Sequence, residues 1–160
     1  MTWKNVYFIF HAPDSARVIK EFTRIVIEGF GKDNLILTRV MGGASGGVEG
    51  ASKDCFKAQK NFLVLRDLED MRDVLSFDKI YIFVPPQFAL KGQINIGEVA
   101  DAIKADKKIA FVFGGGRVSG LTKKEIDAGD PVKILDRDIG ALGSVSILIN
   151  DLEKALKGTE

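Results

Sequence analysis

The strongest constraint on the fold is a set of short apolar runs that have no polar face. The runs are VYFIF at Val6–Phe10, IYIFV at Ile80–Val84 and IAFVF at Ile109–Phe113. Successive residues of a strand point to opposite sides of its sheet, so a run that is apolar throughout is typical of a strand covered on both faces. Such strands occur mainly in parallel sheets with helices on either side.

Segments of helical periodicity alternate with these runs. Further strands are predicted at Leu35–Val40, Phe62–Arg66 and Val132–Leu135. Helices are predicted at Ser15–Gly29, in the fifties, and at Asp67–Leu75, Ile96–Lys104 and about Ser144–Lys157. This order predicts an α/β fold, with a mainly parallel sheet of about six strands flanked by helices. At 160 residues we expect a single domain over residues 1–160, without a separate RNA-binding domain.

The composition indicates a cellular compartment but does not indicate a function. Apolar residues make up 46 % of the chain and charged residues 28 %, and the net charge is +1. Near-zero charge gives no general attraction to nucleic acid, so RNA contact would need basic residues gathered on one face. Cys55 is the only cysteine, which excludes an intrachain disulfide and fits a cytoplasmic protein. The first apolar run is too short to span a membrane, and no membrane association is expected.

The stretch FVFGGGRVSGLTKKEI, at Phe111–Ile126, takes a buried strand into a glycine-rich loop and then a short helix with Thr122 as its N-cap. A phosphate-binding P-loop would end in Gly-Lys-Ser/Thr, which is absent here. A dinucleotide-binding loop has the spacing G-x-G-x-x-G, which Gly114, Gly116 and Gly120 miss by one residue. Two interpretations of the glycine-rich stretch are left by the residues alone: a tight turn and a ligand-binding loop.

The residues after this loop carry a resemblance to a known family. DPVKIL follows as a short strand, and DRDIGALGSVSILINDLEKAL follows as a loop of small residues and a long amphipathic helix. Upstream, ARVIKEFTRIVIEGFGKDNLIL places an arginine on the first helix before Phe-Gly. In this order of elements the chain resembles the SpoU branch of the SPOUT RNA methyltransferases, over nearly its whole length.

The resemblance implies a C-terminal trefoil knot, a homodimer and use of S-adenosylmethionine to methylate a ribose 2′-hydroxyl of RNA, tRNA or rRNA. It implies that Arg24 is the catalytic residue, activating or orienting that hydroxyl. It implies that main chain and small side chains bind the cofactor at Phe113, Gly114, Gly115, Gly116, Gly120, Ile134, Leu135, Leu142 and Gly143.

Several polar residues of the family pattern are absent. The glutamate of the glycine loop is replaced by Gly116 or Arg117, and the family's Ser-Leu-Asn is Ala141-Leu142-Gly143. Val18 stands near the position of the family's first asparagine. These losses favour an alternative, in which the knotted domain is a non-catalytic scaffold that binds RNA or a protein partner.

Other polar residues are less informative. His11 follows the first strand and could be a general base, but a lone histidine there is more often a hydrogen-bonded loop residue. The acidic run Asp67–Asp73 has helical spacing and is interpreted as a solvated helix face. We expect Cys55 to be a neutral thiol, and no carboxylate spacing indicates a metal site. The sequence therefore gives a metal-dependent nuclease little support.

Overall fold

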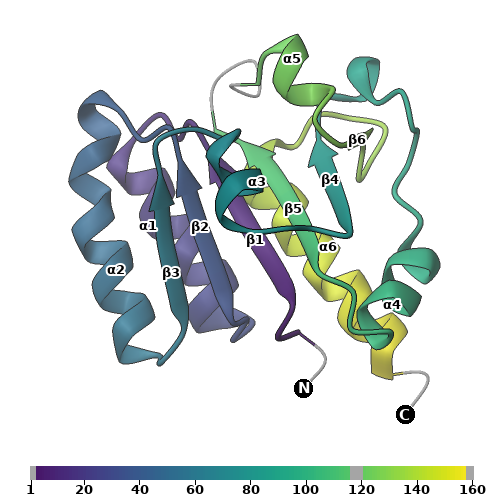
Figure 1. The fold of residues 1–160 in the computed structure, drawn as a ribbon, viewed down its shortest axis with the longest axis horizontal. Coiled ribbons are helices and arrows are strands. Elements are labelled where there is room, and N and C mark those ends of the chain that lie inside the picture. The colour runs from purple at the N-terminus through teal and green to yellow at the C-terminus, as the bar shows by residue number, and fades with distance from the viewer. Residues whose placement is uncertain (1–2, 116–120, 158–160) are drawn as a thin grey trace.

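The computed structural model describes residues 3–115 and 121–157 as one layered α/β unit (Figure 1). Its strands are β1 (Val6–His11), β2 (Asn34–Thr38), β3 (Asn61–Leu65), β4 (Lys79–Phe83), β5 (Ile109–Gly114) and β6 (Asp130–Val132). Its α-helices are α1 (Ala16–Thr23), α2 (Val48–Lys57), α3 (Asp70–Val74), α4 (Ile96–Lys104), α5 (Lys123–Ile126) and α6 (Gly140–Lys157). A π-helical turn η1 (Arg24–Gly29) and the 3₁₀ turns η2 (Gly42–Gly47) and η3 (Pro86–Phe88) complete it.

All neighbouring strands pair in parallel, in the order β3-β2-β1-β5-β4-β6. The predicted α/β fold with a six-stranded parallel sheet is therefore confirmed. The chain begins at the centre of the sheet, extends to the β3 edge and then crosses to the other half. The C-terminal knot is a prediction that the strand order does not test.

Each central strand contributes to two separate cores because alternate side chains leave the sheet on opposite sides. On one face Phe8, Phe10, Phe111 and Phe113 join a large core with side chains from α1, α2, α4 and α6. On the other face alternate residues form a smaller core with Leu68 and Met71. Among the described residues, the short helices α3 and α5 and the adjoining loops cover that second face.

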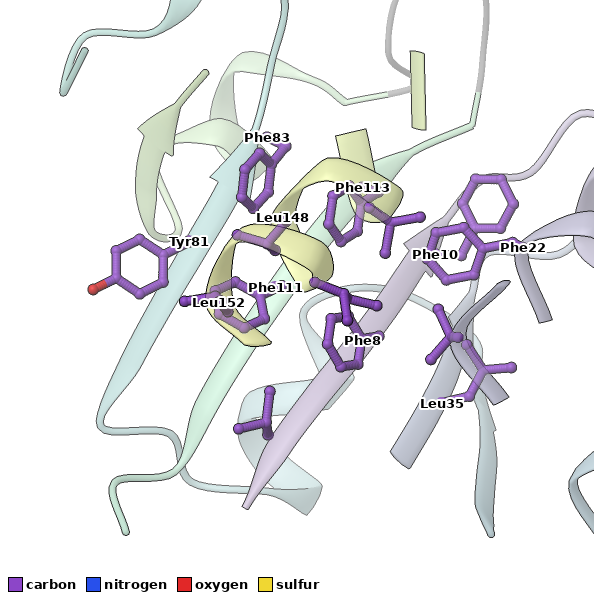
Figure 2. Packing of buried hydrophobic residues seen from close by; sticks show 14 of the residues in the cluster. Phe8, Phe10, Phe22, Leu35, Tyr81, Phe83, Phe111, Phe113, Leu148 and Leu152 are labelled. Carbon is purple, nitrogen blue, oxygen red and sulfur yellow. The ribbon is translucent and has the colours of Figure 1, made fainter. Parts of the chain in front are cut away.

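Aromatic rings form a continuous row on the larger core's side of the sheet, beneath α6 and α1 (Figure 2). Phe111 lies at its centre, with ring centroids 5.6 Å from Phe8 and 5.7 Å from Tyr81. Phe113 stacks on Phe83 at 4.7 Å, and Phe10 stacks on Phe22 at 4.4 Å. The rings bury apolar area between the sheet and the helices on this face.

Polar side chains cap the starts of two helices. Ser15 accepts a hydrogen bond from the Val18 amide, and Thr122 accepts one from the Glu125 amide. Thr122 is the N-cap that the sequence predicts, and Ser15 lies at the predicted start of the first helix. The predicted helix Ser15–Gly29 is divided, however, because its second half is the wider η1 turn.

Two predicted boundaries near the C-terminus are wrong. β6 ends at Val132, so Ile134 and Leu135 lie beyond the strand. α6 begins at Gly140, four residues before the predicted start, because Gly140 takes the left-handed φ of 74° and turns the chain directly into the helix. Ala141-Leu142-Gly143 therefore lies in the first turn of the helix.

Cys55 is fully buried in α2, and burial raises the pKa of its thiol to about 11, with a smaller contribution from Asp54. The prediction of a neutral thiol agrees with this environment. Among the described residues, no helix combines the length and the apolar content that crossing a membrane requires.

The aromatic row gives a direct test of the core. We expect Phe111→Ala to lower the free energy of unfolding by about 3–5 kcal/mol, since it removes a fully buried ring and leaves a cavity. Urea unfolding followed by circular dichroism measures the change. Phe56→Ala is the control, because the Phe56 side chain is 83 % exposed. A loss for Phe111→Ala no larger than for Phe56→Ala would contradict the packing in Figure 2.

Candidate functional site

The carboxyl ends of β1, β5 and β4 form one edge of the sheet because all strands are parallel. Their register places His11 beside Gly114, and Thr38 of β2 beside His11. The loops leaving this edge contain most of the residues to which the sequence gives a role. In open parallel sheets this edge is where ligands bind.

A cleft opens at this edge on the side of the larger core; we call it the edge cleft. It has a volume of about 320 Å³, at the lower end of the range for small-molecule sites. Three groups of apolar and small residues line it: Phe83 to Pro85 at the end of β4, Phe113 to Gly115 at the end of β5, and Gly140 to Leu142 at the start of α6. The polar lining residues are Asp14, Asp138 and Ser144.

The edge cleft includes four of the residues predicted to bind cofactor: Phe113, Gly114, Gly115 and Leu142. The other described ones lie apart from its lining. Ile134 is buried in the larger core, Leu135 packs against that core, and Gly143 lies close to Ile139. Gly116, Arg117 and Gly120 lie outside the described residues.

Gly115 approaches another loop more closely than any side chain would permit. A Cβ there would lie 2.6 Å from the Pro13 Cα and 2.7 Å from the Phe10 ring. The Gly115 amide donates a hydrogen bond of 2.8 Å to the His11 carbonyl. At this position glycine is thus required by packing between the β1 and β5 loops, whether or not a ligand is bound.

Arg24, the predicted catalytic residue, begins η1 and is exposed. It lies outside the lining of the edge cleft, to which the same helical segment contributes Asp14 and Val18. Six residues of helix separate Arg24 from Val18, about 9 Å along the axis. Within one chain, Arg24 therefore lies away from the cleft.

A second polar group lies at the same edge on the opposite face of the sheet. It consists of His11, Arg39, Asp67 and Glu125, which we call the edge tetrad. One Arg39 guanidinium nitrogen, Nη2, lies 2.8 Å from both Asp67 Oδ1 and Glu125 Oε2. His11 Nε2 lies 2.9 Å from Glu125 Oε2, and His11 Nδ1 lies 2.8 Å from Thr38 Oγ1.

Burial and charge set the protonation of the tetrad. Burial lowers the pKa of His11 and outweighs the opposing effect of Glu125, so the imidazole is neutral near pH 7. Burial acts to raise the pKa of Asp67, but the hydrogen bonds from Arg39 and the Leu68 amide lower it overall. Since the His11 ring is neutral, the positive charge in the edge tetrad comes from Arg39.

The structure differs from the sequence-based interpretation at two members of the edge tetrad, Asp67 and His11. Asp67 precedes α3 and pairs with Arg39, so its assignment to a solvated helix face is wrong. His11 is the last residue of β1 and is completely buried, where the sequence favoured a loop residue. His11, Asp67 and Glu125 are the one group of possible metal ligands within the described ranges, with ligand atoms within 4.8 Å of one another.

Comparison with known proteins places the chain in a family. A family model described as "RecB-family nuclease (DUF2122)" matches residues 42–151, which is more than half of the chain. The chain belongs to this family. A curated relative of this DUF2122 chain, "Putative type II restriction enzyme MjaORF1200P" of Methanocaldococcus jannaschii, is 27 % identical over 155 residues, covering 96 % of this chain and 99 % of the relative.

Solved structures similar to the DUF2122 chain carry a different description. A probable methylase family protein from Haemophilus influenzae has a TM-score of 0.77 at 17 % identity, covering 99 % of this chain and 67 % of that one. A probable methyltransferase from Bordetella pertussis has a TM-score of 0.71 at 18 % identity, covering 97 % and 96 %. The "TrmH/SpoU tRNA modifying enzyme" of A. aeolicus has a TM-score of 0.63 at 13 % identity, covering 98 % of this chain and 77 % of that one. The chain therefore has a SpoU-like methyltransferase fold.

The close approach of Gly115 leads to a stability test. We expect Gly115→Ala to lower the free energy of unfolding by about 1–3 kcal/mol, because the added methyl would overlap main chain at Pro13. Thermal or urea unfolding measures this. Gly43→Ala is the control, since a Cβ at Gly43 would meet no atom within 4 Å. Equal stability of the two variants would contradict the contact.

Proposed function

We propose that this chain binds S-adenosylmethionine in the edge cleft and transfers its methyl group to RNA, with a ribose 2′-hydroxyl as the acceptor. The observation that carries the proposal is the position of the cleft in a methyltransferase fold, between the ends of β4 and β5 and the first turn of α6. Four of the residues predicted from the SpoU resemblance line it.

The lining fits the chemistry of this cofactor. Phe83, Phe113 and Leu142 offer apolar surface for a base, and Asp14 and Asp138 offer acceptors for hydroxyl or ammonium groups. The Asp138 carboxylate also accepts a 3.0 Å hydrogen bond from the Gly140 amide, which holds it at the start of α6. When bound, the cofactor supplies an activated methyl group on a sulfonium.

The chain's own contribution to the reaction is mainly alignment. An in-line displacement requires the acceptor oxygen to be held opposite the leaving sulfur, and walls of backbone and apolar side chains can hold it there while they exclude water. The acceptor hydroxyl must also lose a proton. We assign activation of the hydroxyl to Arg24, and its distance from the cleft of its own chain supports a homodimer in which a second copy supplies it.

The proposal includes the trefoil knot, in which α6 passes through an earlier loop of the chain. Packing of α6 against β5, η1 and α4 brings the start of the helix to the edge cleft, as a knotted arrangement would require. The substrate is taken to be tRNA or rRNA in the cytoplasm, in line with the tRNA-modifying enzyme among the similar structures.

Hydrolysis of nucleic acid is the second candidate, and the family description and the name of the Methanocaldococcus relative favour it. Metal-dependent hydrolysis needs a bound cation that activates water. Within residues 3–115 and 121–157, the edge tetrad holds the group of side chains that could bind one. The edge cleft, by contrast, offers only Asp14 and Asp138 as carboxylates.

Cofactor binding is tested first, by isothermal titration and thermal unfolding with S-adenosylmethionine. At 100 times Kd we expect the midpoint of unfolding to rise by roughly 5–10 °C. Leu142→Arg should weaken binding about 100-fold because it buries an unpaired charge in the cleft. The control is Leu90→Arg, at a side chain that is 82 % exposed. No heat and no thermal shift at millimolar cofactor would remove the methyltransferase proposal.

Methyl transfer is tested with tritiated cofactor and unmodified bulk RNA. We expect incorporation that falls about 100-fold or more in Arg24→Ala, while cofactor affinity is unchanged, since Arg24 acts on the acceptor. Arg17→Ala is the control, because Arg17 is an exposed residue of the same helical segment.

The outcomes of this assay separate the candidates. Cofactor binding without incorporation into any RNA would favour the non-catalytic scaffold. Cleavage of RNA or DNA by the same preparation with Mg²⁺ or Mn²⁺, together with no cofactor binding, would favour the nuclease.

A further inference from the structure

The edge tetrad lies on the opposite face of the sheet from the edge cleft and has no part in the methyl-transfer proposal. Its members come from four separate places: the end of β1, the loop after β2, the loop after β3, and α5. Convergence of an imidazole and two carboxylates from three such distant segments is the feature that needs an explanation.

The spacing of the three possible ligands is close to that of a metal site. Their ligand atoms lie within 4.8 Å of one another. Around a single ion with bonds of about 2.0–2.2 Å, neighbouring ligand atoms lie roughly 3–4 Å apart. Small rotations of the carboxylates would therefore bring all three onto one ion.

His11 is oriented toward this group by a contact on its other side. Nδ1 lies 2.8 Å from Thr38 Oγ1, which leaves Nε2 facing the carboxylates. His11 is completely buried, and its Nε2 lies 2.9 Å from Glu125 Oε2 without a hydrogen-bond partner among the described residues. A buried imidazole nitrogen aimed at carboxylates, with its other nitrogen fixed by a neighbour, is the usual arrangement of a metal-binding histidine.

In the structure, the Arg39 guanidinium lies between the side chains of Asp67 and Glu125 and supplies the positive charge there. Its side chain is 30 % exposed and lines a pocket of about 280 Å³ that also reaches Asp67 and Glu125, so it can turn outward into solvent. The carboxylates keep other contacts when it leaves. Asp67 Oδ1 accepts from the Leu68 amide at 2.8 Å, and Glu125 Oε1 accepts from the Thr122 amide at 2.9 Å.

We propose that His11, Asp67 and Glu125 bind a divalent transition-metal ion, of the class that includes Zn²⁺, Mn²⁺ and Co²⁺, in exchange with the Arg39 guanidinium. One imidazole and two carboxylates suit these ions better than Mg²⁺ or Ca²⁺, which favour all-oxygen sites. The pocket lined by Arg39 provides the path of entry. This proposal depends on neither methyl transfer nor hydrolysis.

The experiment uses the full chain, stripped of metal with a chelator and titrated with Co²⁺. We expect a visible absorption band that saturates at one equivalent and is removed by Zn²⁺. Asp67→Asn and Glu125→Gln should each weaken binding by about 10-fold or more, since each removes a charged ligand. Asp127→Asn is the matched control, because Asp127 lines the same pocket but lies outside the ligand group.

Arg39→Gln distinguishes a metal site from a purely structural ion-pair network. If metal and guanidinium compete, this variant should bind Co²⁺ about 10-fold or more tightly than the unaltered chain, because the competing charge is gone. Circular dichroism is used to confirm that each variant is folded. If Glu125→Gln does not fold, Asp67→Asn alone tests the loss of a carboxylate ligand.

Two results would overturn the proposal. One is the absence of a Co²⁺ band in both the unaltered chain and Arg39→Gln at millimolar metal. The other is equal binding by Asp67→Asn, Glu125→Gln and the control. Either would leave the edge tetrad as a network that only holds α5 to the sheet.

Discussion

The pairing of β1 with β5 determines where both candidate sites lie. The two strands run in parallel register from Val6 beside Ile109 to His11 beside Gly114. Their side chains are buried on both faces, so a shift of either strand by one residue would move each side chain into the core on the other face. The same register brings Phe113 and Gly114 to the edge cleft on one face, and His11 to the edge tetrad on the other.

This arrangement bears on the difference between the family description and the fold. The family carries the name of a nuclease, and the architecture is that of SpoU-like methyltransferases. The part of the chain that the structure describes places an apolar cleft and a charged group at one edge, separated by the thickness of the sheet. The two candidate sites thus lie on different faces of the sheet, at the ends of the same two strands.

Most of the fold could be predicted from the sequence because it depends on local patterns. Apolar runs located all six strands to within a few residues, and the cap at Thr122 marked the start of α5. The start of α6 was missed because it depends on the backbone conformation of Gly140, which composition alone does not give. The cleft was partly predictable, since strand ends and small residues indicate a ligand edge.

The edge tetrad could not be predicted, because its four members are separated by up to 114 positions and no spacing joins them. The available signal was that His11, Arg39 and Asp67 each lie at the end of a parallel strand or just after it. That signal needs the strand order, which places β1, β2 and β3 side by side.

Glu125 has several partners at once. One oxygen accepts from the Thr122 amide and closes the cap of α5, and the other lies against Arg39 and His11. Aspartate is one methylene shorter and could not span these partners, and glutamine would lose the charge. A substitution of Glu125 therefore breaks several contacts at once, whereas the exposed lysines that precede it, Lys123 and Lys124, can be exchanged with little effect on the fold.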